Sequence, residues 1–186
     1  MHGECTEMKA NTTGKPEPSS ATHQIPSQSW LSPNVIVKAS GIEGSGLFAA
    51  SRIEAGEIVI SLGGELIDDA ALRALEPPYS SLVLDDDLNL LMDSSHPAKY
   101  GNHSCDPTLW HRDSTTIVAR RTVEMGEELT IDYGTHTLVE WWSMTCLCGS
   151  AICRGSIGGG DWRLEHLQRA YGDHWAAPLL RRIQFR

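Results

Sequence analysis

The chain has 186 residues, 40% of them hydrophobic, which is enough for one globular domain with tails and a buried core. Asp and Glu number 24 against 15 Lys and Arg, giving a formal net charge of −9, so the composition argues against direct nucleic-acid binding and suits a basic partner or simple solubility. No run approaches the ~18 apolar residues of a membrane helix, and no secretion signal is visible, so we expect no membrane association and a cytoplasmic protein, nuclear if the host is a eukaryote.

Four segments of different composition follow one another along the chain. Residues 1–29 are rich in Ser, Thr, Pro, Lys and Glu and lack apolar periodicity, which predicts a disordered tail. Residues 30–143 contain short β-rich runs and predict a mostly β domain with long loops. A cysteine-rich stretch occupies residues 144–157, and residues 158–186 take a helical period.

The β-rich runs predict the elements of the central domain in chain order. A short helix is expected at residues 68–75, with Asp68 or Asp69 as its N-cap. The acidic turn at residues 85–87 predicts a hairpin between the runs on either side. Residues 47–51 are expected to lead into a turn at residues 54–56. Strands are expected at residues 35–38, 57–62, 65–67, 82–84, 88–92, 115–119 and 128–131.

The last segment predicts two helices that cover an edge of the domain. Asp161 is expected to cap the first helix, and Gly172 is expected to end it. A second apolar face runs over residues 175–183, where Pro178 is confined to an N-terminal turn or a kink.

Cysteine spacing is the strongest chemical signal in the chain. Three of the five cysteines fall within CLCGSAIC, residues 146–153, and an odd count argues against a disulfide framework. Structural zinc takes four ligands in a tetrahedron, and Cys105 is the best fourth because Cys5 lies in the expected tail. The alternative is a group of buried thiols without a metal. The expected zinc ligands are Cys105, Cys146, Cys148 and Cys153.

Residues 100–110 read YGNHSCDPTLW and place His103 two residues before Cys105. Such a pair also suits a cysteine nucleophile with a histidine base, but a nucleophile needs a third group to orient the base, and sequence adjacency does not establish one. We therefore favour the metal-ligand interpretation of this cysteine.

Two further motifs are weak on their own. The glycines of residues 41–46, GIEGSG, let a backbone approach a ligand, but the further glycine and the helix of a dinucleotide fingerprint are missing. The run EELTIDYG ends an expected strand and places the Tyr133 phenol at a loop edge, where it enters a pocket or is buried as an ordinary core tyrosine.

Taken in order, GSG, LGGELI, NHSCDP, ELTIDYG and CxCx4CRG resemble the SET-domain family of protein lysine methyltransferases with its cysteine-rich post-SET segment. The resemblance covers residues 33–155, and residues 30–143 would be the SET-like catalytic domain, 144–157 the post-SET zinc segment and 158–186 a helical extension. The runs SSHPAKYGNHSCDP and GGGDWRLEHLQRAYGDHW look more like small stand-alone bacterial members than chromatin enzymes.

The resemblance implies a mostly β fold of small antiparallel sheets around a pseudoknot, with C-terminal helices. It implies methyl transfer from S-adenosylmethionine to the ε-amine of a lysine in a basic protein or peptide, with Tyr133 as the catalytic residue, and a structural Zn²⁺. The glycine-rich turn would cradle the cofactor, Asn102 and His103 would hold its amino-acid and adenine portions, and Leu147 would pack on the adenine. The implied cofactor-binding residues are Glu43, Gly44, Ser45, Gly46, Leu62, Asn102, His103, Tyr133 and Leu147.

Two positions depart from the family pattern. Leu62 stands where a tyrosine is usual, and Ile131 stands where an aromatic residue precedes the catalytic tyrosine. Both changes predict a wider and less polar channel, which favours addition of more than one methyl group or a small-molecule acceptor. A non-catalytic peptide-binding module is a third reading. An acidic groove at the channel mouth would favour a basic protein, and the candidates for it are Glu65, Asp68, Asp69, Asp85, Asp86 and Asp87.

Overall fold

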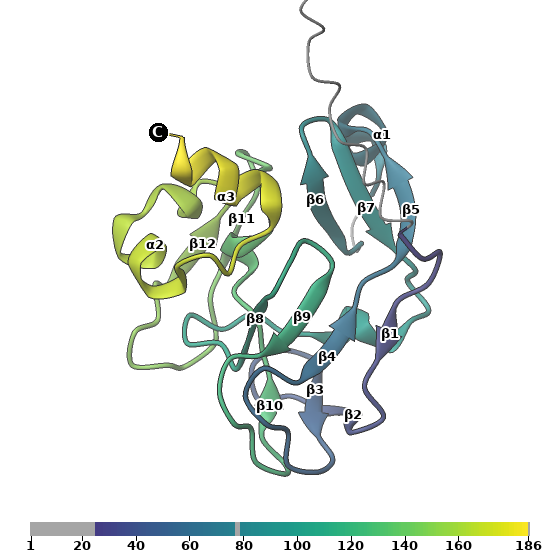
Figure 1. Ribbon diagram of the computed structural model, residues 1–186, viewed down its shortest axis with the longest axis vertical. Helices are drawn as coiled ribbons and strands as arrows, with labels where there is room; N and C mark the ends of the chain where they lie inside the picture. Colours follow the sequence, from purple (N-terminus) through teal and green to yellow (C-terminus); the bar gives the residue numbers. More distant parts are fainter. Residues whose placement is uncertain (1–24, 77–78, 186) are drawn as a thin grey trace, which may run out of the picture.

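The computed structural model describes residues 25–76 and 79–185, so nearly all of the expected tail at residues 1–29 lies outside the described residues (Figure 1). In the described part, the strands form four small sheets in which every paired strand is antiparallel. The first sheet has the strand order β1 (Trp30–Leu31), β4 (Ile58–Ser61), β9 (Thr116–Ala119) and β8 (Leu109–His111). The second has the order β10 (Glu128–Leu129), β3 (Ser45–Ala49) and β2 (Val35–Ala39), and the third has the order β5 (Gly64–Ile67), β7 (Leu88–Met92) and β6 (Ser81–Asp85). The fourth pairs β11 (Ser143–Thr145) with β12 (Ser156–Gly158).

The helices are short and stand at the periphery. Figure 1 shows the β5–β7–β6 sheet with α1 on one side at the top, the C-terminal helices opposite with the β11–β12 pair beside them, and the other two sheets below. The expected fold class, mostly β with small antiparallel sheets and C-terminal helices, is confirmed. The helical segments are α1 (Asp69–Ala74), η1 (Pro97–Tyr100), η2 (Tyr133–Thr135), η3 (Asp161–Arg163), α2 (Glu165–Tyr171) and α3 (Ala177–Gln184).

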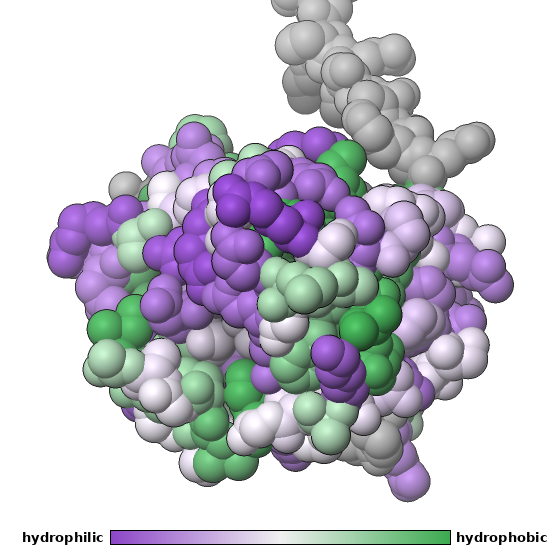
Figure 2. Space-filling model, turned by 90° about the horizontal axis from the view of Figure 1, so that it is seen from below, coloured by the Kyte–Doolittle hydropathy of each residue, from purple (hydrophilic) through white to green (hydrophobic). Residues whose placement is uncertain are grey.

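Each expected strand is present, although the run at 128–131 pairs as a named strand only over Glu128–Leu129. The turn expected after residues 47–51 is present at residues 55–56, but the central strand β3, Ser45–Ala49, was not predicted. Leu47 and Ala49 are buried there, and tertiary packing overrides the turn-forming glycines that precede them. The edge strand β2 leaves Ile36 and Val37 exposed, and Figure 2, which views the molecule from below, shows hydrophobic and hydrophilic groups mixed on that face.

Local capping chemistry explains the ends of α1 and of the β6–β7 hairpin. The Asp68 Oδ1 accepts a hydrogen bond of 2.7 Å from the Ala71 N–H, which makes Asp68 the N-cap of α1. The hairpin turns at Asp87, whose φ of 56° is a left-handed conformation that aspartate tolerates better than most residues. Both expectations for this region are confirmed.

The C-terminal segment begins differently from the prediction. Asp161 does not cap a helix; it opens the 3-10 turn η3, and α2 begins after Leu164 without a side-chain cap. The Asp161 carboxylate instead faces Arg154, with Oδ2 3.1 Å from Nη2, so it is not turned toward the helix. Gly172 ends α2 at a φ of +55°, and Pro178 lies in the first turn of α3, both as expected.

The C-terminal helices belong to the main hydrophobic core. Trp175 and Leu179 are fully buried and join the same cluster of side chains as Leu109 and Leu129 of the central sheets. The Ala176 N–H donates to the Thr135 carbonyl at 3.0 Å, directly beside the segment that carries Tyr133. On the surface, two ion pairs join α3 to the acidic hairpin, Arg181 with Asp85 and Arg182 with Asp86.

One parallel contact aligns two loops that are distant in sequence. The Ile131 N–H donates to the Asn102 carbonyl at 3.0 Å, and the Ser104 N–H donates to the Ile131 carbonyl at 3.2 Å. This pairing places residues 102–105, here called the NHSC loop, beside the segment that leads to Tyr133. The expected pseudoknot requires these two segments to be neighbours. In the described residues, no helix is long and apolar enough to cross a bilayer.

Asp132 joins three segments of the chain inside the core. Its side chain is fully buried and accepts hydrogen bonds from both terminal nitrogens of the Arg154 guanidinium, Nη1 at 2.7 Å and Nη2 at 2.8 Å. The Tyr171 hydroxyl of α2 donates to Oδ2 at 2.8 Å, and the Gly134 N–H donates to Oδ1 at 3.0 Å. Burial raises the pKa of Asp132, but the hydrogen bonds and charge of Arg154 outweigh burial and leave this pKa below its usual 3.8.

We expect Leu179→Ala to lower the free energy of unfolding of the whole domain by about 2–5 kcal/mol, because Leu179 fills the shared core and truncation leaves a cavity. Urea denaturation followed by tryptophan fluorescence measures the change. Arg181→Ala is the matched control on the exposed face of the same helix, where an ion pair contributes little. If α3 melts in a separate early transition and the rest is unaffected, the shared core is disproved.

Asp132→Asn should destabilise the domain by about 3–5 kcal/mol at neutral pH, since it leaves the Arg154 charge buried without its partner. Because the folded pKa is depressed, the stabilisation is present above pH 3.8 and is lost as the pH falls through the lower folded value. The difference in free energy of unfolding between wild type and variant should therefore become smaller below pH 3.8, as measured by urea denaturation at a series of pH values. Glu140→Gln, at an exposed ion pair with Arg163, is the control and should leave the stability nearly unchanged.

Candidate functional site

Tyr133 opens the 3-10 turn η2 just after the segment that pairs with the NHSC loop. Its hydroxyl donates to the Gly101 carbonyl at 2.7 Å, and its N–H donates to the His103 Nδ1 at 3.2 Å. Burial, with a smaller contribution from the charge of Glu43, raises the pKa of Tyr133 to about 12. The phenol is therefore a neutral hydrogen-bonding group at physiological pH, held in place through both its side chain and its backbone.

A cavity of about 290 Å³ lies against the Tyr133 ring. Its walls are mainly aliphatic, and the sequence-predicted residues Leu62 and Ile131 are both part of them. Two histidines, His111 and His136, also line it. An amine that enters this cavity leaves water for an apolar environment, which disfavours its charged form.

Both nitrogens of the His103 ring contact other groups of the protein. The ring is buried, and its Nδ1 accepts from the Tyr133 N–H, so the proton of the neutral ring lies on Nε2. Nε2 is 3.4 Å from the Cys105 sulfur and donates toward it. Burial lowers the pKa of His103 to about 4, which keeps the ring neutral. With both ring nitrogens engaged, contacts of His103 with a cofactor fall to its backbone.

Asn102 ties the glycine-rich turn to the NHSC loop. Its Nδ2 donates to the carbonyls of Glu43 at 3.2 Å and Ser45 at 3.1 Å, and to the Glu128 Oε1 at 2.9 Å. A Cβ at Gly46 would lie 2.2 Å from that Glu128 oxygen, so only glycine permits this approach. The structure thus brings Glu43, Ser45 and Asn102 together, as the sequence predicts for a cofactor cradle.

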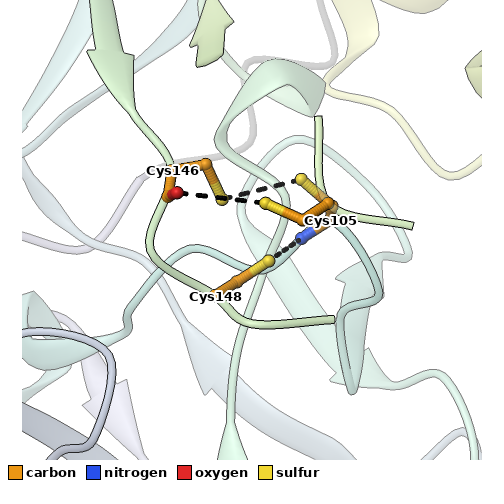
Figure 3. A group of neighbouring side chains, drawn as sticks. Cys105, Cys146 and Cys148 are labelled. Atoms are coloured by element: carbon orange, nitrogen blue, oxygen red, sulfur yellow. Dashed lines mark hydrogen bonds between the residues drawn. The ribbon is translucent and has the colours of Figure 1, made fainter. Parts of the chain in front are cut away.

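Four cysteine sulfurs converge where the cysteine-rich stretch at residues 144–157 meets the NHSC loop, and Figure 3 shows the labelled side chains turned toward one another. All four sulfurs lie within 4.8 Å of one another, and the Cys105 and Cys146 sulfurs are 3.7 Å apart. Four sulfurs at ~2.3 Å from one tetrahedral Zn²⁺ lie about 3.8 Å apart. The donor set and its spacing therefore fit zinc. The four residues are Cys105, Cys146, Cys148 and Cys153.

The thiols of this cluster have unequal proton affinities. Burial raises the pKa of Cys105 and of Cys146. Burial acts the same way on Cys148, but hydrogen bonding from the Cys105 N–H, 3.5 Å away, and contact with Ser150 outweigh it and lower the pKa of Cys148 to about 6. A thiolate is therefore accessible at neutral pH, and thiolates are the form that ligates metals.

Not every predicted residue joins these groups. Leu147, between two of the cysteines, is 60% exposed. Leu62 lies in the wall of the cavity and in the hydrophobic core. Cys5 lies outside the described residues.

Sequence reasoning missed several residues that hold the site together. Glu128 links the turn to the NHSC loop by accepting from the Ser40 hydroxyl at 2.8 Å as well as from Asn102. Neither Arg154 nor the histidine pair in the cavity was singled out from the sequence. The pattern that could have found Arg154 is a lone arginine directly after the last cysteine of the cluster.

Comparisons with known proteins agree with this geometry. The family model of the SET domain matches residues 44–134. Histone-lysine N-methyltransferase trithorax of Drosophila virilis is 37% identical over 133 residues, which cover 62% of this chain and 3% of that protein. Histone-lysine N-methyltransferase ASHH3 of Arabidopsis thaliana is 32% identical over 132 residues, which cover 62% of this chain and 36% of that protein.

Among solved structures, the methyltransferase domain of the human histone-lysine N-methyltransferase SETMAR superposes with a TM-score of 0.53 at 18% identity, covering 67% of this chain and 58% of that one. That likeness shows a shared fold. The similarity to small stand-alone bacterial members stays a prediction. The family match and the relatives agree that residues 44–134 of this chain are similar to a SET domain, and the solved structure shows that the fold is shared.

Proposed function

We propose that this chain is an S-adenosylmethionine-dependent methyltransferase that methylates the ε-amine of a lysine in a basic protein, and that a structural zinc ion holds its C-terminal segment in place. The observation that carries the proposal is the position of Tyr133. Its phenol donates to the carbonyl of Gly101, the residue before the Asn102 that ties the turn, and Tyr133 also lines the 290 Å³ cavity. Curated relatives of the SET domain are histone-lysine methyltransferases by name, which supports the reaction class.

The cavity and Tyr133 prepare the amine for transfer. Aliphatic side chains in the walls disfavour the ammonium form, so the amine leaves its proton with solvent water and enters the cavity as the neutral base, whose nitrogen lone pair is free to react. Because the Tyr133 hydroxyl donates its hydrogen bond to the Gly101 carbonyl, the lone pairs of the hydroxyl oxygen are free to accept a hydrogen bond from an amine N–H. Alignment of this kind is worth up to ~7–11 kcal/mol of barrier, and the phenol, with a pKa of about 12, has no need to act as a base.

The glycine-rich turn and Asn102 are the proposed cofactor cradle. The Asn102 Nδ2 donates hydrogen bonds to the turn. Its Oδ1 has no partner among the described residues and is therefore an acceptor for the amine of a ligand. The exposed Glu43 and its carboxylate suit a ligand that carries positive charge. When bound there, S-adenosylmethionine supplies an electrophilic methyl group. In this proposal Leu147, exposed beside the cysteine cluster, covers the adenine.

An acidic hollow next to the cavity supports a basic substrate. This open hollow of about 580 Å³ shares Tyr79 and Met92 with the cavity, and its acidic residues are Glu65, Glu76 and Asp93. Of the acidic candidates expected at the channel mouth, only Glu65 lines it.

The other acidic candidates have structural partners. Asp85 and Asp86 pair with the arginines of α3, and Asp68 caps α1. Asp69 accepts from the Asn89 amide, and Asp87 accepts from the Asp69 N–H. A basic peptide is therefore expected to be held by the hollow and not by the β6–β7 hairpin.

Tyr133→Phe should lower methyl transfer by at least ~10²-fold while leaving S-adenosylmethionine binding nearly unchanged, because it removes a group that orients the amine. Cell extract proteins incubated with enzyme and heavy-methyl S-adenosylmethionine, then digested for mass spectrometry, identify the acceptor lysine and the number of methyl groups added. Tyr100→Phe is the matched control, since Tyr100 does not line the cavity. If calorimetry shows S-adenosylmethionine binding but no label reaches any protein, the proposal is contradicted and a binding module is favoured. If label is found on small amines alone, an enzyme that acts on small molecules is favoured.

The purified chain should contain one zinc ion, and Cys105→Ser should weaken its binding and lower the melting temperature, because the energy of metal binding is folding energy. Zinc content by mass spectrometry and thermal unfolding with and without a chelator provide the measurements. Cys5→Ser is the control and should retain full zinc. Full zinc occupancy in Cys105→Ser would contradict the four-cysteine site.

A further inference from the structure

Two histidines form a hydrogen-bonded pair in the wall of the cavity. The His111 Nε2 lies 3.2 Å from the His136 Nδ1, and the rings meet edge to face with centroids 5.3 Å apart. His111 is in β8 and has no exposed surface, whereas His136 follows η2, three residues after Tyr133. The His136 and Tyr133 ring centroids are 5.7 Å apart, so the pair adjoins the proposed reacting group.

The partners of the pair determine where its protons lie. The His111 Nδ1 is 3.1 Å from the Asp113 carbonyl, which only accepts, so this nitrogen carries a proton. In a neutral His111 ring, Nε2 is then unprotonated and must accept from the His136 Nδ1. A neutral His136 that is protonated on Nδ1 has an unprotonated Nε2. Burial lowers the pKa of His111 to about 4 and that of His136 to about 3, which supports two neutral rings.

The outer end of this chain of hydrogen bonds is unused within the protein. Among the residues that the structure describes, no hydrogen bond to the His136 Nε2 is recorded, although the residue lines the cavity. The backbone of His136 is held at both ends, because its N–H donates to the Tyr133 carbonyl at 3.3 Å and its carbonyl accepts from the Val83 N–H at 3.2 Å, while His111 contacts the ring. The His111 carbonyl likewise accepts from the His174 Nδ1 at 2.7 Å.

We propose that His136 offers its unprotonated Nε2 to the cavity as a second acceptor for the N–H groups of the methyl-accepting amine, and that His111 is a positioning residue that holds this tautomer. The inference rests on the proposed methyltransferase function. A neutral primary amine that directs its lone pair at the methyl group has two N–H bonds to satisfy. The Tyr133 oxygen and the His136 Nε2 supply one acceptor each in otherwise mostly aliphatic surroundings.

This arrangement makes His136 a specificity-determining residue. An unmethylated lysine matches both acceptors, whereas a monomethylated lysine has only one N–H and leaves one acceptor unpaired, which costs binding in a buried site. His136 therefore favours the first methylation over later ones. It supplies polarity where the predicted wide channel, with Leu62 and Ile131, lacks it.

The tautomer is tested in the chain without added ligand. In protein labelled with ¹⁵N-histidine, NMR should show the His136 Nδ1 protonated and its Nε2 unprotonated near neutral pH. The His111→Gln variant keeps an acceptor for the His136 Nδ1 and should preserve this pattern, whereas His111→Leu removes the acceptor and should move the proton to Nε2. A protonated His136 Nε2 in the wild-type chain would overturn the inference.

The role in transfer is tested with the acceptor peptide found by heavy-methyl labelling, in unmethylated and monomethylated form. His136→Leu should lower kcat/KM for the unmethylated peptide about tenfold and that for the monomethylated peptide much less. His136→Gln, which restores an acceptor, should recover most of the loss, and melting temperature and S-adenosylmethionine binding verify that both variants are folded. Equal loss on both peptides, or no loss, would overturn the inference while the wild-type activity stands. A wild-type chain without transfer would instead fail the proposed function and this inference with it.

Discussion

The buried ion pair between Asp132 and Arg154 is the interaction on which the rest of the structure depends. Two charges taken out of water are tolerated only when their hydrogen-bonding capacity is met, and Asp132 meets this condition with donors from Arg154, Tyr171 and Gly134. Because Arg154 follows the last cysteine of the cluster and Tyr171 lies in α2, one carboxylate fastens both C-terminal segments to the residue next to Tyr133.

Buried contacts also link the cysteine cluster to Tyr133. The His103 ring lies between the two, with one nitrogen on the Tyr133 backbone and the other on the Cys105 sulfur. The Arg154 N–H also donates to that sulfur at 3.3 Å. A metal held by the cysteines would therefore stabilise the position of Tyr133 through short, buried contacts, without touching the substrate itself.

The cavity walls carry Leu62 and Ile131, where the family resemblance leads us to expect a tyrosine and another aromatic residue. In the proposed reaction these two aliphatic side chains disfavour a charged amine but offer its N–H groups no acceptor. The polarity comes instead from Tyr133 and from the His111–His136 pair. His111 owes its rigid surroundings partly to the C-terminal extension, because His174 bonds its carbonyl and stacks on Trp110.

The sequence by itself determined the features that depend on local chemistry and spacing. These include the strands with β-branched residues, the Asp68 cap, the Gly172 stop and the cysteine spacing, since each is set by residues close in the chain. Motif order was enough to place Tyr133 beside the NHSC loop. The tertiary structure alone decided the strand β3, the turning of Asp161 toward Arg154, the Asp132 junction and the histidine pair. The Asp132 junction and the histidine pair arise between residues 22 to 39 positions apart, and β3 depends on packing around a strand. Asp161 and Arg154 are only seven positions apart, but their contact depends on how the chain folds back between them.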